Sequence, residues 1–474
     1  MSPVKTIQTE YGDKYDCVGL YEQPALRHRL LKNHKIQMRP SFDPQRDNAN
    51  PTGNGTSDNS INVALTDSCP SGTVPIRRRS TAEVSRAKAL FRQQFPRFNK
   101  STKNNLGFAF AGITTRYEAT TMYHGAGGMI SINNPAAISG QVSASAISLE
   151  GGDPDQYSII RVGWMVNVDL YHDNLTRLYA AWVQVKNGKQ TGCYNTYCPG
   201  FVQTDTAIAL DMPLVPISVV RGPQYYIKLS VTQDKSTGNW WLNYGDNAKR
   251  VGYWPSSLFT NLGNGAPGLR WGGTVSSSTS FLPQMGNGDN GQYHSAHFRH
   301  VELQYDAGTS LNGTIAVTLD VMQNRCYKSG DNYYKGEFWG YSFYFGGDGG
   351  DTLLFSLKRL RKNISQTQSG EHESTAYKPV MWPNTICFGG LRLNLLHYMS
   401  CKRCPIRCLR TLRRPGLLGN GILEFLVKFP VMVSELLKGR VSETRSYGTG
   451  HHKGQGPHRC RRALIQHARC LSWL

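Results

Sequence analysis

The chain has 474 residues, which is enough for two or three folded domains. Only 18% of the residues are charged, while 49 are Gly, 23 are Pro and 24 are Tyr. This composition excludes a coiled coil and a wholly disordered chain, and it favours many short strands. No segment reaches about 18 uninterrupted apolar residues, so the sequence predicts neither a membrane-spanning helix nor a membrane partner.

The net charge of +21 is concentrated at the C-terminal end of the chain. Residues 351–474 hold 21 of the 53 Lys and Arg residues but only 6 of the 32 Asp and Glu residues, a net charge of +15. This distribution argues against nucleic acid as a partner of the whole protein. Nucleic-acid binding by the basic end alone stays as an alternative.

Residues 1–105 are predicted to form a small region that docks on a larger domain. Residues 43–68 are mostly Asn, Asp, Ser, Thr, Gly and Pro, a composition typical of a loose segment. Ser80 begins the sequence Ser-Thr-Ala-Glu, the pattern of a capping box in which the hydroxyl and the carboxylate bind free amides. Apolar residues then recur at helical spacing, so the sequence predicts a helix over 81–92.

Residues 107–346 predict an antiparallel β domain. Strands are expected over 159–169, 201–210, 225–232, 239–244, 300–305 and 314–321, with a polar hairpin link between the third and the fourth. In the first of these strands Ile160, Val162 and Trp164 alternate with Arg161, which therefore lies on the opposite face. Strands at this spacing, with almost no helical intervals, indicate a two-sheet sandwich or an open barrel.

The β domain holds seven tryptophans. Most tryptophans of such domains fill the core, but aromatic side chains also line peptide or saccharide clefts. Four of them are candidates for a cleft, namely Trp164, Trp240, Trp241 and Trp271. Because Trp240 and Trp241 are adjacent, they must face opposite surfaces of their sheet, so one of the two can line a groove.

Cysteine and histidine spacing predicts one disulfide but no metal site, and no motif indicates a cofactor. Cys193 and Cys198 close a tight loop, which favours a disulfide in an oxidising compartment. Two sets have a spacing that resembles metal ligands: His397 with Cys401, Cys404 and Cys408, and the triplet His294, His297 and His300. The set at 397–408 lies in a segment without the regular strand or helix pattern that would hold four ligands in a tetrahedron. The three histidines at 294–300 would alternate between the two faces of a strand, so they could not bind one metal ion together.

Residues 347–474 are predicted to form an irregular, basic tail. They contain six of the 11 cysteines and several Arg and Lys clusters, and the strand-like alternation stops there. This composition is compatible with a genuine basic appendage. It is equally compatible with a chain end altered by splicing or by a change of reading frame.

Several motifs occur together in the order found in one protein family. In the N-terminal region they are Leu30-Leu-Lys-Asn-His34, Ile36-Gln-Met-Arg-Pro40 and Cys69-Pro-Ser-Gly-Thr-Val-Pro-Ile-Arg-Arg78. In the β domain they include Gly163-Trp164, Thr191-Gly-Cys-Tyr-Asn195, Cys198-Pro-Gly-Phe-Val-Gln-Thr204, Gly238-Asn-Trp-Trp-Leu242, Gly252-Tyr-Trp-Pro255, Trp271-Gly-Gly273 and Gln284-Met-Gly286. Over residues 3–346 the chain therefore resembles plant neprosin-type proteins that carry an N-terminal activation peptide.

The resemblance implies an antiparallel two-sheet β-sandwich that is preceded by an inhibitory propeptide. It also implies a secreted glutamic endopeptidase that cleaves after proline, in which one glutamate is a general base and its partner stays protonated. An extracellular location and a peptide or protein ligand follow from it. The sequence that begins at Met1 lacks the apolar stretch of a signal peptide, so the location rests on the resemblance alone.

The sequence departs from the family at both glutamate positions. The residue at the first is Arg161, and the residue at the second is Thr274. Arginine keeps its proton and threonine does not titrate near neutral pH, so neither can replace the general base. We therefore expect an inactive peptidase homologue that binds peptides, with Arg161 favouring acidic ones. The alternative is an active peptidase that uses other carboxylates, such as Asp169, Asp205 or Glu302.

Overall fold

The computed structural model describes residues 3–41, 59–95, 107–115, 120–153, 155–289, 294–307, 309–314, 317–321 and 326–351. Strands dominate these ranges, and the helices found there are too short or too polar to cross a membrane. Almost all of the predicted tail, with its His397 and cysteine set, lies outside the described residues.

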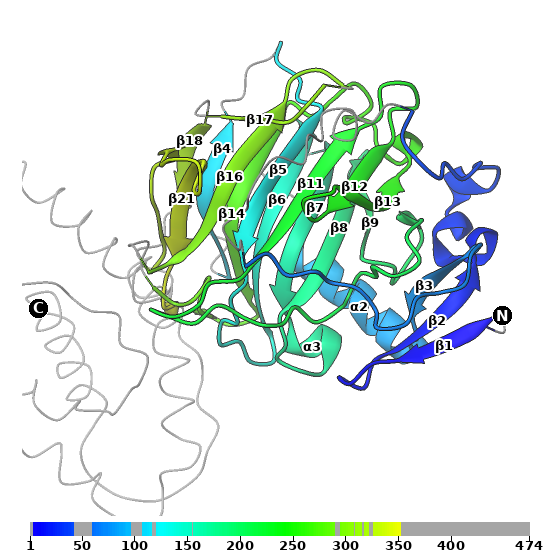
Figure 1. The fold of residues 1–474 in the computed structure, drawn as a ribbon, viewed down its shortest axis with the longest axis horizontal. Helices are drawn as coiled ribbons and strands as arrows, with labels where there is room; N and C mark the ends of the chain where they lie inside the picture. The colour runs from blue at the N-terminus through cyan, green and yellow to red at the C-terminus, as the bar shows by residue number, and fades with distance from the viewer. Residues whose placement is uncertain are drawn as a thin grey trace, which may run out of the picture. The chain divides into compact units, whose positions relative to one another are not determined.

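One sheet of the β domain has seven strands in the order β18-β4-β14-β6-β7-β8-β9, with every neighbouring pair antiparallel (Figure 1). Along the chain the strands are β4 (Phe108–Thr115), β6 (Gln141–Asp153), β7 (Gln156–Val166), β8 (Arg177–Lys186), β9 (Lys189–Tyr194), β14 (Gly268–Ser277) and β18 (Val317–Val321). Strand β6 separates β14 from β7, and this order positions the candidate site.

The second sheet has ten strands along the path β10-β13-β12-β11-β5-β16-β21-β19, with β17 paired to β16 and β20 paired to β21. They are β5 (Gly125–Ser131), β10 (Val202–Gln203), β11 (Tyr226–Gln233), β12 (Trp240–Tyr244), β13 (Lys249–Trp254), β16 (Ala296–Gln304), β17 (Asn312–Gly313), β19 (Lys328–Ser329), β20 (Tyr333–Tyr334) and β21 (Tyr341–Gly346). A separate pair joins β15 (Phe281–Leu282) to β22 (Gly350–Asp351), and η4 spans Ser256–Leu258.

The two sheets pack face to face around one hydrophobic core. The indole of Trp164 on β7 donates a hydrogen bond to the carbonyl of Ser131 on β5, with 2.8 Å between nitrogen and oxygen. The indole of Trp271 on β14 donates to the carbonyl of Gly127 on the same strand β5, at 3.0 Å. Burying both rings removes a large apolar area from water while the ring N–H groups stay hydrogen-bonded. The prediction of an antiparallel two-sheet sandwich is confirmed.

The N-terminal region has its own small sheet and one helix. The sheet pairs β1 (Lys5–Gln8), β2 (Lys14–Gly19) and β3 (Thr73–Arg77), and three short turns follow β2, namely η1 (Leu20–Glu22), η2 (Pro24–Arg27) and η3 (Arg29–Leu31). Helix α2 (Thr81–Gln94) begins with the predicted capping box, and it packs against β9 and α3 (Val168–Tyr171). The predicted helix over 81–92 is therefore confirmed.

Two predicted strands end earlier than the sequence pattern indicates. The strand over 159–169 ends at Val166, because the side chain of Asn167 accepts a hydrogen bond from the amide of Leu170 and caps α3. In the segment 201–210 only β10 is a strand, since the Asp205 carboxylate binds the amides of two residues that follow it and makes a turn. Local side-chain capping overrides the alternating pattern in both places.

Candidate functional site

Arg161 and Thr274 lie on the same outer face of the seven-stranded sheet. Arg161 on β7 is opposite Ser148 of β6, and Thr274 on β14 is opposite Ala144 of the same strand. Because Ala144 and Ser148 are four residues apart on β6, they share one face, and their partners share it too. Both Arg161 and Thr274 line one small cavity of about 30 Å³. The structure thus brings together the two residues that the resemblance assigns to the positions of the family glutamates.

The wall of this cavity is apolar and aromatic. Besides Arg161 and Thr274, its described lining residues are Gln94, Phe95, Phe108, Val142, Ala144, Met165, Tyr179, Tyr194 and Ser276. None of these is an acid. Burial raises the pKa of Tyr179 to about 12, although the charge of Arg161 opposes this rise, so the phenol keeps its proton near neutral pH. The described lining can donate hydrogen bonds, but it contains no group that could accept a proton from water.

The side chain of Arg161 is engaged by the protein itself. Its Nε donates to the Ser148 hydroxyl at 2.9 Å, and its Nη2 lies 3.5 Å from Oε1 of Glu150 on β6. The guanidinium also lies over the ring of Phe95, 5.3 Å from the ring centroid. Only 11% of the side chain is exposed. Arg161 therefore acts as a buried cation whose charge Glu150 balances.

Glu150 is a carboxylate beside this cavity that the sequence did not single out. It accepts a hydrogen bond from the Tyr157 hydroxyl at 2.6 Å, and Nη1 of Arg270 lies 3.7 Å from its Oε2. Burial alone would raise the pKa of Glu150, but the two guanidinium groups outweigh burial and lower the pKa below its usual range. Glu150 is thus held ionised as a structural partner and is a poor base. Only the strand register places it near Arg161, so no local sequence pattern could reveal it.

We expect the substitution Glu150→Gln to lower the free energy of unfolding by about 1–3 kcal/mol at pH 7, because it leaves the guanidinium of Arg161 without its anion, while Arg270 keeps Asp320 at 3.1 Å. The folded-state pKa of Glu150 lies below the value of about 4.3 for an unfolded chain. The stabilisation is therefore complete at neutral pH and is lost as the pH falls through the folded-state pKa. Urea unfolding between pH 3 and 7 should show that the difference between native protein and variant narrows in acid. A difference that is constant with pH would contradict this account.

The end of α2 closes the cavity from the N-terminal region. Phe91 and Phe95 pack against Tyr194 of β9, with ring centroids 4.9 and 5.9 Å from its ring. The Tyr194 hydroxyl also donates a hydrogen bond to the side-chain oxygen of Gln94. Residues 94 and 95 therefore cover the face on which Arg161 lies. The sequence predicted the helix but not where it would dock.

The carboxylates considered as replacements do not meet at this cavity. Asp169 accepts hydrogen bonds from the Ser139 hydroxyl and the Gly140 amide, both at 2.6 Å, and it belongs to α3 rather than to a strand. Asp205 binds backbone amides in its turn. Glu302 lies on β16 of the other sheet, where burial raises its pKa and Lys228 opposes that rise. None of the three carboxylates lines the Arg161–Thr274 cavity.

The four tryptophans proposed for a cleft are fully buried. Trp164 and Trp271 bridge the two sheets, and the indole of Trp240 donates to the Leu262 carbonyl at 2.9 Å. These three are core residues, so the prediction that they line a cleft is wrong. Trp241 does face the opposite surface of its sheet, where it packs with Ala25 of the N-terminal region and with Val202 and Tyr253. The N-terminal region covers that surface.

The expected disulfide between Cys193 and Cys198 is present. A second one joins Cys17 on β2 to Cys69, and its partners are 52 residues apart, so no local pattern could reveal it. His297 is buried against the Tyr226 hydroxyl at 2.9 Å, while His300 contacts a backbone carbonyl of another loop. In the described residues no group of three or more His, Cys, Asp or Glu side chains is placed to hold a metal ion.

Comparisons with known proteins match both parts of the described structure. A family model described as Neprosin matches residues 139–348, which include Arg161 and Thr274, and a model described as Neprosin activation peptide matches residues 6–114, which include α2. Among solved structures, the chain is similar to scytalido-glutamic peptidase crystallised with a peptide-based transition state analog, with 12% sequence identity, a TM-score of 0.28 and coverage of 51% of this chain and 98% of that one. A crystal structure of scytalido-glutamic peptidase with a transition state analog inhibitor matches with the same identity and coverage and a TM-score of 0.29.

Proposed function

Because the chain belongs to the neprosin family, we propose that it is a peptidase-like protein that binds peptides without hydrolysing them. One observation supports this proposal above the others. Arg161 and Thr274, which the resemblance assigns to the positions of the family glutamates, line one cavity, and none of its described lining residues is an acid. Peptide hydrolysis by a glutamate pair needs one carboxylate to take a proton from water and another to give one. Neither role can be filled here.

The rate consequence is large. Removing one positioned acid or base typically lowers a rate by roughly 10²–10⁴, and this cavity lacks both. Glu150 does not replace them, because its charge is engaged by Arg161 and Arg270. A peptide bound on this face of the sheet in place of the end of α2 would therefore meet hydrogen-bond donors and aromatic rings but no activated water.

We place the proposed role outside the cell. The two disulfides, Cys17–Cys69 and Cys193–Cys198, are of the kind that persists in oxidising compartments. The partner in this proposal is a peptide or a protein segment rather than nucleic acid or a membrane. The salt bridge to Glu150 takes up the charge of Arg161, so we expect acidic and neutral peptides to bind with similar affinity.

The proposal is tested by measuring hydrolysis and binding on the same full-length preparation, after acid treatment to release the end of α2 from this face. A quenched fluorescent peptide that contains proline should be cleaved no faster than in a protein-free blank between pH 3 and 7. Fluorescence anisotropy should show that peptide binding weakens at least ~10-fold in S276R, because Ser276 lines the cavity, but not in the matched control S278R, because Ser278 is exposed beyond it. Turnover that disappears in D169N or E302Q, or equal binding by S276R and S278R, would contradict the proposal.

A further inference from the structure

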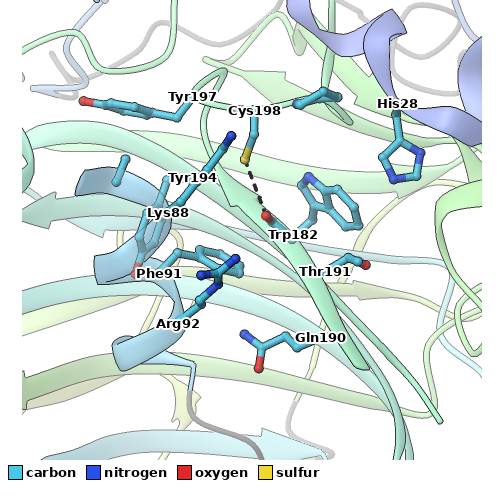
Figure 2. A pocket seen from close by; sticks show the side chains of 13 residues that line it. His28, Lys88, Phe91, Arg92, Trp182, Gln190, Thr191, Tyr194, Tyr197 and Cys198 are labelled. Atoms are coloured by element: carbon cyan, nitrogen blue, oxygen red, sulfur yellow. Dashed lines mark hydrogen bonds between the residues drawn. The ribbon is translucent and has the colours of Figure 1, made fainter. Parts of the chain in front are cut away.

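A second and larger cavity lies between α2 and strands β8 and β9 (Figure 2). Its volume is about 300 Å³, at the lower end of the range typical of small-molecule pockets. Aromatic side chains supply much of its wall, namely Phe91 from α2 and Trp182, Tyr194 and Tyr197 from the sandwich. A wall of this kind suits a flat apolar group about the size of one ring.

The charged side chains of this cavity are all basic. Lys88 and Arg92 are one helical turn apart on α2, and in Figure 2 they lie on the helix side of the cavity, across from Trp182. Neither forms an ion pair with another described residue. His28 also lines the cavity, and burial together with Arg29 lowers its pKa, which keeps it uncharged near neutral pH. No acid occurs among the described lining residues, so the cavity favours an anion.

Two buried donors in the wall have no acceptor among the described residues. They are the ring nitrogen Nε1 of Trp182 and the amide nitrogen Nε2 of Gln190. Trp182 is only 2% exposed, and a Cβ atom at Gly200 would lie 2.4 Å from its Nε1, so the ring has little room to turn. Both nitrogens have almost no accessible surface, so they do not face the empty cavity, and the basic side chains alone favour an anion there.

From these observations we infer that the cavity binds a small monocarboxylate with a single aromatic ring. The ring packs between Phe91 and Trp182, and the carboxylate lies toward Lys88 and Arg92. Because such a ligand contacts α2 and the sandwich at the same time, it stabilises the docked helix by mass action. This inference does not depend on the proposed lack of catalysis, since it concerns a different cavity and different side chains.

The test is isothermal titration calorimetry on the full-length protein with three probes. 3-Phenylpropionate should bind, 3-phenylpropan-1-ol should bind at least tenfold more weakly because it lacks the charge, and acetate should show no binding because it lacks the ring. The double variant K88Q/R92Q should lose at least tenfold in affinity for 3-phenylpropionate. The matched control K186Q/K189Q removes the same charge from exposed positions outside the cavity lining and should bind as the native protein does.

A further variant separates the contribution of the Gln190 side-chain amide to binding from that of the basic side chains Lys88 and Arg92. Q190M keeps the length of the side chain and leaves both basic side chains in place, so the affinity for 3-phenylpropionate should stay within about twofold of the native value, because Nε2 of Gln190 does not face the cavity. Unchanged near-ultraviolet circular dichroism would show that the fold of the variant is intact. Equal binding of acid and alcohol, native affinity in K88Q/R92Q, or no binding of 3-phenylpropionate would each overturn the inference.

Discussion

The double variant R161E/T274E is expected to hydrolyse a quenched fluorescent proline peptide at least ~100-fold faster than the native chain, because it restores an acid and a base to one cavity. Two carboxylates that share a cavity separate in pKa, so one can accept a proton while the other donates one. Arg270 remains near Glu150 and balances part of the added negative charge. The measurement is the initial rate of fluorescence increase after acid treatment.

The controls separate carboxylate chemistry from a change in cavity shape. R161Q/T274Q places side chains of the same length at both positions without any charge, and it should remain at the rate of the blank. Each single glutamate variant should stay well below the double variant, since one carboxylate cannot fill both roles. Equal rates for the Glu and Gln double variants would show that these two positions do not determine activity.

The second large effect is expected from D13N, which should lower the free energy of unfolding by about 3–5 kcal/mol. Asp13 of the N-terminal region bridges two arginines, with Arg77 at 2.7 Å and Arg177 at 2.6 Å from its two oxygens. The Arg177 side chain is fully buried, so removing the Asp13 charge leaves this cation with only Asp173, which is 28% exposed, as its ion-pair partner. Urea unfolding followed by tryptophan fluorescence measures the difference.

D16N is the matched control for this experiment. Asp16 also pairs with an arginine, Arg78, at 2.5 Å, but 47% of the Arg78 side chain is exposed. An exposed pair contributes little, so D16N should cost less than about 1 kcal/mol. If D13N and D16N destabilise the protein equally, the buried ion pairs do not hold the N-terminal region to the sandwich as the structure indicates.

Features set by neighbouring residues could be predicted from the sequence. The capping box at Ser80 and the hairpin of β11 and β12 depend on contacts within a few residues, and both are present. Alternation placed Arg161 on the face opposite Trp164, and the structure confirms that arrangement. The same alternation predicted that the strand extends to Asp169. It ends earlier because the Asn167 cap starts α3, and alternation contains no information about that cap.

Features that depend on distant parts of the chain could not be predicted. The Cys17–Cys69 disulfide, the place of Glu150 beside Arg161 and the docking of Phe95 over the cavity all follow from long-range packing. The tryptophans show the same limit, since both a cleft and a core favour aromatic residues. Only the buried hydrogen bonds of the three core tryptophans, two of them between the sheets and one to a loop carbonyl, decided between these roles.

The central claim is that a cavity with Arg161 and Thr274 in place of two glutamates activates no water. Its most direct test is to incubate the native full-length protein, after acid treatment, with an unbiased library of peptides and to identify new termini by mass spectrometry. We predict no new termini beyond those of a protein-free control at any pH from 3 to 7. The claim would be contradicted by new termini that share one residue type at the cleaved bond, if R161E/T274E produces no more of them than the native protein does.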